Sequence, residues 1–224
     1  MSGLPVFVIR PEPGNAATVA AALARDLDAR GFPLFTVAAQ PWTLPAGPFD
    51  AILAGSANIF RHGGPLLDAL KAVPVIAVGE TTADTARAHG FAVESVGEGG
   101  LQPVVETLTP GRYLRLAGED RVTLTPPSGV RIETSVVYAA QPHPLPPEMA
   151  QALAHGGVVL LHSGAAARHL SQCCEMAEIP RKQLRLACLA PRIASMAGEG
   201  WGQIGVASAR TDMDLLELAK RMCQ

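Results

Sequence analysis

Small and hydroxyl-bearing residues directly follow several short apolar runs of the chain, and their types suit the binding of an acidic ligand. Ser56 follows AILAG, Gly79 and Thr82 follow VPVIAV, and Ser163 follows VVLLH. The carboxyl ends of parallel strands lie beside helix N-termini, which present unpaired N–H groups and the positive end of a dipole. A cleft lined this way suits an elongated ligand with several carboxylates. Any one of these residues alone is better explained as a helix cap, and only their repetition favours binding.

Three arginines lie at or just beyond the ends of predicted strands, and they supply the other half of anion recognition. They are Arg10, Arg115 and Arg192. The planar guanidinium matches a carboxylate and stays charged at any physiological pH. Arg10 is the strongest candidate because the rigid turn at 11–13, Pro-Glu-Pro, follows it directly. Each of the three could equally be a solvated surface residue.

Tyr138 is one of only two tyrosines, and its segment SVVYAAQP echoes the earlier TVAAQP. We interpret the segment as a crossover between two lobes, where a side chain would face the cleft. The phenolic O–H is a directional donor that can assist a leaving oxygen. The alternative is that the ring only packs against its neighbours.

The motifs of common cofactor sites are absent from the sequence. No G-x-G-x-x-G follows a predicted strand, no Walker A lysine occurs, and the histidines show no zinc spacing with glutamate or cysteine. Ser163 lies in H-S-G and not in the G-x-S-x-G turn of hydrolases. We therefore expect no cofactor, no metal and no hydrolase triad.

Composition and charge narrow the class of protein. Of the 224 residues, 48% are hydrophobic and 17% are charged, which indicates a globular chain of one large or two small domains. The formal net charge of -2, without a basic tail, gives no footprint for nucleic acid. The four cysteines form no C-x-x-C pair, and neither a signal peptide nor a membrane-spanning apolar run is evident. We expect a cytoplasmic protein with no nucleic-acid or membrane partner.

Short apolar runs alternate with alanine-rich segments of helical period, which is typical of an α/β protein with a mostly parallel sheet. The expected strands are 6–10, 34–37, 51–54, 74–78 and 92–95, and the expected helices are 14–30, 58–71 and 81–89. In the first helix, Asn15 is the expected N-cap, and Val19, Leu23 and Leu27 form one apolar stripe.

The second half of the chain resembles the first. GFPLFTVAAQP is matched by GVRIETSVVYAAQP, ILAGSAN by VLLHSGA, and VPVIAVGETTA by LRLACLAPRIA. This order of matched segments indicates two similar lobes. The alternative is that any α/β chain has some self-similarity.

The chain resembles the uroporphyrinogen-III synthase family in six ordered segments: VIRPEPG, AILAGSAN, VPVIAVGETTADTARAHGF, SVVYAAQP, VVLLHSGAA and CLAPRIA. They extend over nearly the whole chain, and VGETTA and VYAAQP are the most specific. The resemblance implies an α/β fold of two flavodoxin-like parallel-sheet lobes joined by a two-stranded linker. It places residues 1–36 and 143–224 in the first lobe and 41–135 in the second, with linkers at 37–40 and 136–142.

The resemblance also implies the activity. Members of the family convert hydroxymethylbilane, a linear tetrapyrrole with eight carboxylates, into cyclic uroporphyrinogen III, with loss of water and inversion of the last ring. They need no metal or prosthetic group. We expect a monomer that contacts the upstream bilane-forming enzyme at most transiently.

By position, Tyr138 matches the cleft tyrosine of the family, the candidate that assists departure of the hydroxyl group. The expected substrate-binding residues are Arg10, Ser56, Gly79, Thr82, Ser163 and Arg192. The chain departs from the family where many members have a threonine, because Ile193 has no hydroxyl to donate. Either Arg192 takes over carboxylate contact there, or that corner contributes little.

Other classes of protein fit the sequence less well. A two-lobe solute-binding protein would usually carry an export signal. A receiver-type signalling domain would need clustered aspartates at strand ends, and Asp50, Asp68 and Asp84 are not so placed. A non-catalytic two-lobe protein that binds a tetrapyrrole or a small anion stays open, and the isomer formed from hydroxymethylbilane distinguishes it from an enzyme.

Overall fold

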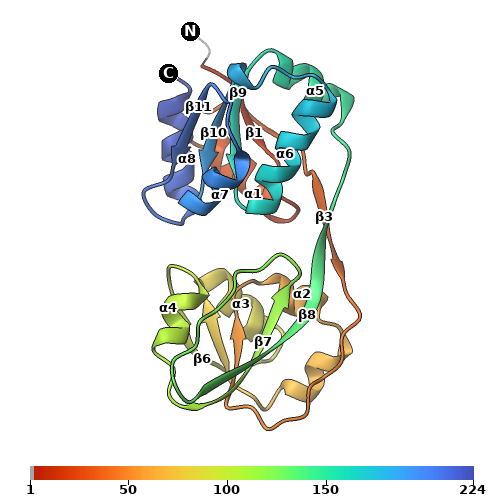
Figure 1. Cartoon of the computed structure of the whole chain (residues 1–224), viewed down its shortest axis with the longest axis vertical. Coiled ribbons are helices and arrows are strands. Elements are labelled where there is room, and N and C mark those ends of the chain that lie inside the picture. Colours follow the sequence, from red (N-terminus) through yellow and green to blue (C-terminus); the bar gives the residue numbers. More distant parts are fainter. Residues whose placement is uncertain (1–2) are drawn as a thin grey trace. The chain divides into compact units, whose positions relative to one another are not determined.

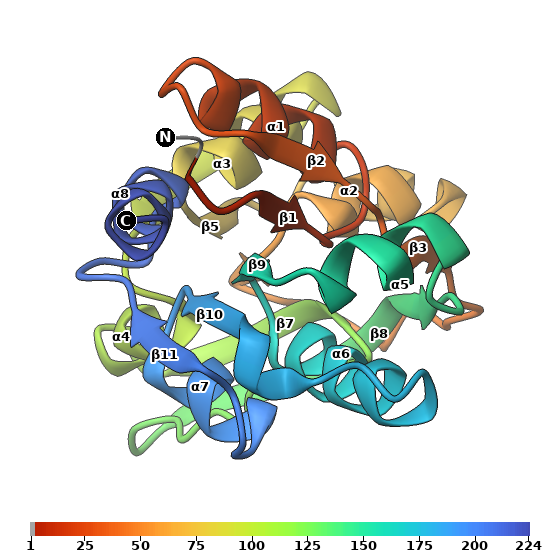
Figure 2. The same ribbon diagram turned by 90° about the horizontal axis from the view of Figure 1, so that it is seen from above.

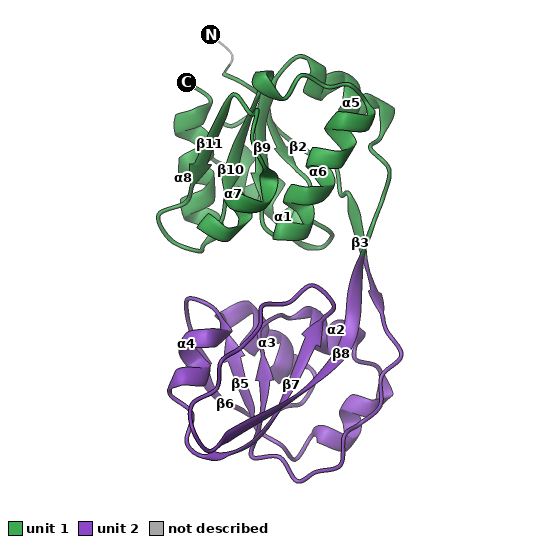
Figure 3. Ribbon diagram, viewed as in Figure 1, with its two compact units in different colours: residues 1–36, 141–224 green, residues 37–140 purple. Residues whose placement is uncertain are grey.

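The computed structural model describes residues 3–224, so the first two positions of the predicted segment 1–36 lie outside the described residues. The chain divides into two compact units, coloured separately in Figure 3. Unit 1 is Met1–Thr36 with Gln141–Gln224, and unit 2 is Val37–Ala140. That each unit is a domain that folds on its own stays a prediction.

Unit 1 contains a five-stranded parallel sheet (Figure 1). Its strands are β1 (Val6–Val8), β2 (Ala29–Gly31), β9 (Gly157–Leu161), β10 (Leu184–Cys188) and β11 (Gln203–Val206). They lie in the order β11-β10-β9-β1-β2, with every neighbouring pair parallel. Renumbered along the chain, this is the 2-1-3-4-5 order of flavodoxin-like sheets, which reverses between β1 and β9.

Helices cover both faces of the unit 1 sheet, as Figure 2 shows. One face packs against α1 (Gly14–Leu23) and α8 (Asp212–Met222). The other face packs against α5 (Pro147–Ala154), α6 (Gly164–Met176) and α7 (Pro191–Ala197), and a short 3-10 helix, Arg181–Gln183, precedes β10. The fully apolar β9, GVVLL, is buried along its whole length because both of its faces are covered.

Unit 2 is built on a six-stranded sheet with the order β3-β8-β7-β4-β5-β6. The strands are β3 (Phe35–Ala39), β4 (Ala51–Ala54), β5 (Val75–Val78), β6 (Val93–Gly97), β7 (Gly111–Gly118) and β8 (Val130–Pro142). The strands from β4 to β8 pair in parallel. The order of these five is 3-2-1-4-5 along the chain, a doubly wound arrangement that reverses between β4 and β7.

The unit 2 sheet also lies between two helical layers. On one face are α2 (Asn58–His62), the 3-10 helix Pro65–Leu70 and α3 (Glu80–Ala88). On the other is α4 (Leu101–Glu106), which packs in one cluster with Ala51 and Leu53 of β4 and Tyr113 of β7. The prediction of an α/β protein of two lobes with parallel sheets is confirmed.

The predicted helix 14–30 is wrong in its second half. Helix α1 ends at Leu23, and residue Asp26 adopts the left-handed conformation with φ of 61°, which ends the helix before β2. Leu23 is 54% exposed and does not belong to a buried stripe. Asn15 is also not the N-cap: its side-chain amide donates to the carbonyl groups of Val8 and Arg10 at 2.7 and 3.0 Å.

The predicted helix 58–71 is divided in two. Helix α2 stops at His62, and the chain turns at Gly64, whose φ of 68° favours glycine. Pro65 then begins the 3-10 helix. Periodicity alone overlooked this break because both pieces direct apolar residues to the same core.

Candidate functional site

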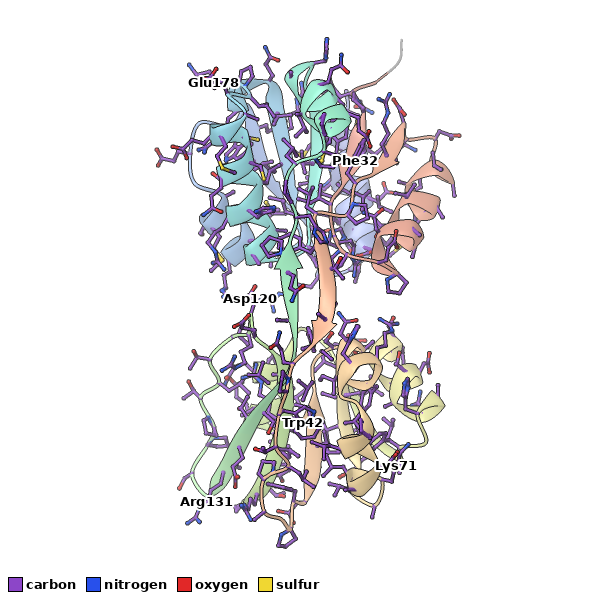
Figure 4. The ribbon with its side chains drawn as sticks, turned by 90° about the vertical axis from the view of Figure 1, so that its right-hand side faces the viewer. Phe32, Trp42, Lys71, Asp120, Arg131 and Glu178 are labelled. Carbon is purple, nitrogen blue, oxygen red and sulfur yellow. The ribbon has the colours of Figure 1, made fainter. Side chains whose placement is uncertain are left out.

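The strongest candidate site of unit 2 is a pocket at the point where the strand order of its sheet reverses. In doubly wound folds, ligands bind beyond the carboxyl ends of the strands at this switch point. The pocket has a volume of about 190 Å³. Its wall includes Ser56, two residues after the end of β4, Gly118 at the end of β7, and Tyr138 of β8. Asp120 marks this end of the sheet in Figure 4, and Arg131 marks the opposite end.

Tyr138 is positioned by a β-bulge and by a glycine. The register of β7 and β8 shifts between Ala117 and Gly118, so that Gly118 pairs with Tyr138. Bulges turn the following side chains to new directions. A Cβ atom on Gly118 would lie only 2.6 Å from Cε2 and Cζ of the tyrosine ring. Glycine is therefore required for the ring to lie against the strand.

The surroundings of Tyr138 favour the protonated form of its hydroxyl group. Burial raises the pKa of Tyr138, while a side-chain hydrogen bond with Ser56 acts in the opposite direction. The Oγ atom of Ser56 accepts the N–H of Asn58 at 3.2 Å. Tyr138 and Ser56 therefore share a side-chain hydrogen bond, and each hydroxyl group can both donate and accept.

Arg115 lies on β7 beside this pocket and is almost fully buried, with 7% of its surface exposed. One guanidinium nitrogen donates to the carbonyl of Val122 at 2.9 Å. Burial lowers the pKa of Arg115, and the positive charge of Arg121 adds to this. The same guanidinium borders a second cavity of about 510 Å³ beneath the segment 119–126.

The other predicted residues of unit 2 lie at the start of α3. Gly79 has a φ of 77°, and a Cβ atom there would meet no atom within 4 Å, so its backbone is open to a ligand. Thr82 is only 5% exposed, in the first turn of the helix. Neither is in the wall of the 190 Å³ pocket.

The reversal point of the unit 1 sheet, between β1 and β9, is filled by the unit's own side chains. Arg10 follows β1, and its guanidinium binds the carboxylate of Asp212 at 2.9 Å. Thr18 donates to the same carboxylate at 2.8 Å. Nε2 of His162, directly after β9, lies 3.3 Å from it. The predicted anion-binding arginine therefore already holds a carboxylate of the protein.

These contacts change the titration of both acidic and basic members of the cluster. Burial would raise the pKa of Asp212, but the hydrogen bond and charge of His162, the charge of Arg10 and the Thr18 hydroxyl lower it to about 2. Burial lowers the pKa of His162, and the nearby Asp212 opposes this shift. The cluster stabilises Asp212 in its ionised form.

The two remaining predicted residues of unit 1 have different environments. Ser163 caps α6, because its Oγ atom accepts the N–H of Ala166 at 3.1 Å. Arg192 is exposed in the first turn of α7. Its neighbour Ile193 is 7% exposed and packs in the core, where an apolar side chain is the natural choice.

Sequence reasoning missed Gly118, His162 and Asp212. Gly118 carried no signal, because its role depends on the bulge. A signal for the start of α8 was present in Thr211 and Asp214, which have the spacing of a capping box, and Oγ1 of Thr211 accepts the N–H of Asp214 at 3.1 Å. It would have placed Asp212 at a helix N-terminus.

Residues 3–224 show neither a metal-binding cluster nor a membrane-spanning helix. In this part of the chain, no three His, Cys, Asp or Glu side chains come together in a group that could hold a metal ion. Over the same residues, every helix is too short or too polar to cross a membrane.

Fold and site together define a two-unit, doubly wound α/β protein with a hydroxyl-lined pocket at a sheet reversal. A family profile described as uroporphyrinogen-III synthase HemD matches residues 33–217. The chain therefore belongs to the uroporphyrinogen-III synthase family, as its sequence motifs predict. A search of curated proteins finds no match.

Solved structures share the fold along almost the whole chain. The uroporphyrinogen-III synthetase from Helicobacter pylori 26695 is 17% identical, with a TM-score of 0.62, over 98% of this chain and 99% of that chain. A mutant uroporphyrinogen III synthase from the extremely thermophilic bacterium Thermus thermophilus is 16% identical, with a TM-score of 0.50, over 97% of this chain and 98% of that chain.

Family membership sets the activity of the chain. It is a hydro-lyase of porphyrin and heme biosynthesis that acts on a small-molecule tetrapyrrole. The alternative of a non-catalytic binding protein is not favoured.

Proposed function

We propose that the chain cyclises hydroxymethylbilane in the pocket of unit 2, with Tyr138 as the proton donor to the departing hydroxyl group. The observation that carries this proposal is the placement of Tyr138 in the wall of a small pocket, beside Ser56 and in surroundings that favour the protonated phenol. Because burial raises its pKa, the phenol keeps its proton at neutral pH until the substrate takes it.

In the reaction that we propose, Tyr138 acts in the first step. Proton donation from Tyr138 lets the hydroxyl leave as water, and the substrate becomes a cationic azafulvene. The substituted carbon of the last ring then attacks the methylene, and the resulting spiro intermediate rearranges to the inverted ring. The pyrrole carbon that finally closes the macrocycle loses a proton, which restores the phenol. Positioned acid catalysis contributes on the order of 10²- to 10⁴-fold in rate.

The protein's larger contribution is to hold the substrate ends in the geometry for ring closure. The entropy of orientation accounts for on the order of several kcal/mol of the barrier. We propose Arg10, Ser56, Gly79, Thr82, Ser163 and Arg192 as substrate-binding residues. Of these, Ser56 has the strongest support because it touches Tyr138. Binding through Arg10 requires the substrate carboxylate to share the guanidinium with Asp212.

We further propose a cytoplasmic monomer with no metal or prosthetic group and at most transient contact with the bilane-forming enzyme. The support for this location is the state of the cysteines. Cys173, Cys174 and Cys188 are buried free thiols, and Cys223 is a half-buried one. Free thiols are typical of a reducing compartment.

The test is the identity of the product. The purified chain is mixed with freshly generated hydroxymethylbilane, and the product is oxidised and separated by isomer. We expect the type III isomer to form faster than spontaneous closure forms type I. Exclusive formation of type I at the spontaneous rate would refute the proposed function.

A further inference from the structure

Arg115 is a buried cation for which the described part of the chain supplies no anion. Within residues 3–224, no carboxylate oxygen lies within ion-pair distance of its guanidinium. Its hydrogen bond is to a neutral group, the Val122 carbonyl. An unpaired charge is costly to remove from water, so buried charges are normally paired or bound to a ligand. The site is therefore incomplete without an anion.

The unbonded nitrogens of Arg115 remain accessible. A guanidinium carries five N–H donors, of which the Val122 carbonyl uses one. In residues 3–224, no nitrogen of Arg115 is among the fully enclosed side-chain atoms that lack a hydrogen-bond partner. The free donors of Arg115 therefore reach the cavities that it borders.

The cavity that Arg115 shares with Tyr138 is sized for part of a substrate. Its volume of about 190 Å³ is below the roughly 300–1,000 Å³ of pockets that enclose a whole drug-sized ligand. A tetrapyrrole cannot enter it as a whole, but one ring edge with an acidic side arm can. Arg121 adds positive charge to the same wall, against the single carboxylate of Asp120.

We propose that Arg115 binds a carboxylate side arm of the substrate ring that carries the hydroxymethyl group. This inference rests on the proposed function and adds a residue to it. A guanidinium binds a carboxylate through two parallel hydrogen bonds, which fix the plane of the carboxylate as well as its position. With Tyr138 in the same pocket, the bound arm holds the ring so that its hydroxyl group meets the phenolic O–H. Arg115 is thus a substrate-binding residue that orients the reacting ring.

The bound carboxylate also supplies the missing counter-charge. Departure of water creates a positive charge on the substrate ring, and an unneutralised guanidinium nearby would oppose it. Once a substrate carboxylate is bound, the pair is close to neutral, and Asp120 remains as the negative group of the pocket wall. The arrangement favours loss of water only when the correct arm is in place.

The test combines variants of the chain with analogues of the substrate. Hydroxymethylbilane and two analogues are prepared, in which the acetate or the propionate of the hydroxymethyl-bearing ring is replaced by a methyl or ethyl group. For Arg115→Gln we expect KM for the natural substrate to rise roughly ten- to hundredfold, the value of a hydrogen bond to a charged group. With the analogue that lacks the bound arm, wild type and variant should differ by less than twofold.

A matched control lies on the same strand. Arg112 pairs with Glu133 at 2.5 Å, near the start of β7 and away from the pocket. Arg112→Gln removes the same charge and should change KM by less than twofold with every substrate. Arg115→Lys keeps the charge without the planar fork, and it should recover part of the affinity.

The possible outcomes separate this inference from the proposed function. An equal loss for Arg115→Gln with all three substrates would overturn the inference, because a structural role does not depend on the arm. The same conclusion follows if Arg115→Gln lowers kcat alone, since a carboxylate contact held throughout the reaction acts on KM. Failure of the proposed function appears instead in the wild type, as exclusive formation of the type I isomer.

Discussion

The two units place polar side chains at equivalent positions of their sheets but use them differently. At the reversal of the unit 1 sheet, Arg10 is bound to Asp212, which also accepts from Thr18. At the reversal of the unit 2 sheet, Tyr138 lies in the wall of a pocket and Arg115 has no anionic partner in the described residues. In unit 1 the polar groups stabilise the fold, whereas in unit 2 they remain available to a ligand.

This contrast shows why strand-end residue types alone do not identify a site. Ser56 and Ser163 occupy matched positions in the sequence. Ser163 uses its oxygen to cap α6, while Ser56 contacts the tyrosine of the pocket. The two serines differ in the group that shares a hydrogen bond with each side chain. A residue's function therefore depends on whether its hydrogen-bonding capacity is already used.

The largest effect is expected for Tyr138→Phe. Removing the hydroxyl group should lower kcat by about 10²-fold or more, because the acid is lost, and leave KM nearly unchanged. Steady-state kinetics with hydroxymethylbilane measure both quantities, and circular dichroism checks that the fold is kept. An unchanged kcat would remove Tyr138 from its catalytic role.

A smaller loss of turnover is expected for Gly118→Ala. The new methyl group would lie 2.6 Å from the ring of Tyr138, so the ring must move. Misplacement of a reacting group and local overpacking should lower kcat by about tenfold. Gly47→Ala is the matched control, because a Cβ atom there meets nothing closer than 3.8 Å. Equal activity of the two variants would mean that the ring position does not matter.

In unit 1 we expect Asp212→Asn to act on stability. The carboxylate pKa is lowered from 3.8 to about 2, so its ionised form stabilises the folded state above about pH 4. Because the carboxylate is 41% exposed, solvent screening limits the loss at pH 7 to about 1 kcal/mol. The difference from wild type should shrink as the pH falls from 4 towards 2.

The two tryptophans allow unit 1 to be followed separately. Trp42 lies in unit 2 and Trp201 in unit 1, so a Trp42→Phe background leaves fluorescence only from unit 1. Urea unfolding of Asp212→Asn in this background gives the free energy of unfolding at each pH. A difference from wild type that does not change between pH 7 and pH 2 would contradict the assigned ion pair.

The smallest effect is expected for Ser163→Ala. Loss of the α6 cap should reduce the free energy of unfolding by about 0.5–1 kcal/mol. Thermal unfolding measures the loss, and KM for hydroxymethylbilane tests the additional binding role of Ser163. If Ser163→Ala lowers the free energy of unfolding by the expected amount but leaves KM unchanged, then Ser163 acts only as the cap of α6 and does not bind the substrate.

The sequence predicted the fold class because buried parallel strands give unmistakable apolar runs, such as β9. It could not predict the end of α1, since Asp26 ends the helix through its backbone conformation and not through its side-chain type. Tyr138 was singled out from its repeated segment, and its role stays a prediction. Its orientation was not predictable, because it depends on the bulge opposite Gly118, a non-local contact.

The electrostatic partners were the least predictable part of the site. Arg10 and Asp212 are separated by almost the whole chain and meet only in the folded unit 1. Arg10 therefore appeared from the sequence as a free anion-binding residue. Arg115 appeared as one of three arginines at strand ends and was ranked behind Arg10, and only its burial without an anionic partner in the described residues distinguishes it.

The central claim, that the chemistry belongs to the unit 2 pocket and not to the unit 1 cluster, is tested by one paired measurement. Tyr138→Phe and Asp212→Asn are compared with wild type in single-turnover formation of the type III isomer at neutral pH. The account predicts a rate lower by about 10²-fold or more for the first variant, and within about threefold of wild type for the second, because an exposed ion pair contributes little. A hundredfold loss in Asp212→Asn beside a nearly normal rate in Tyr138→Phe would contradict it.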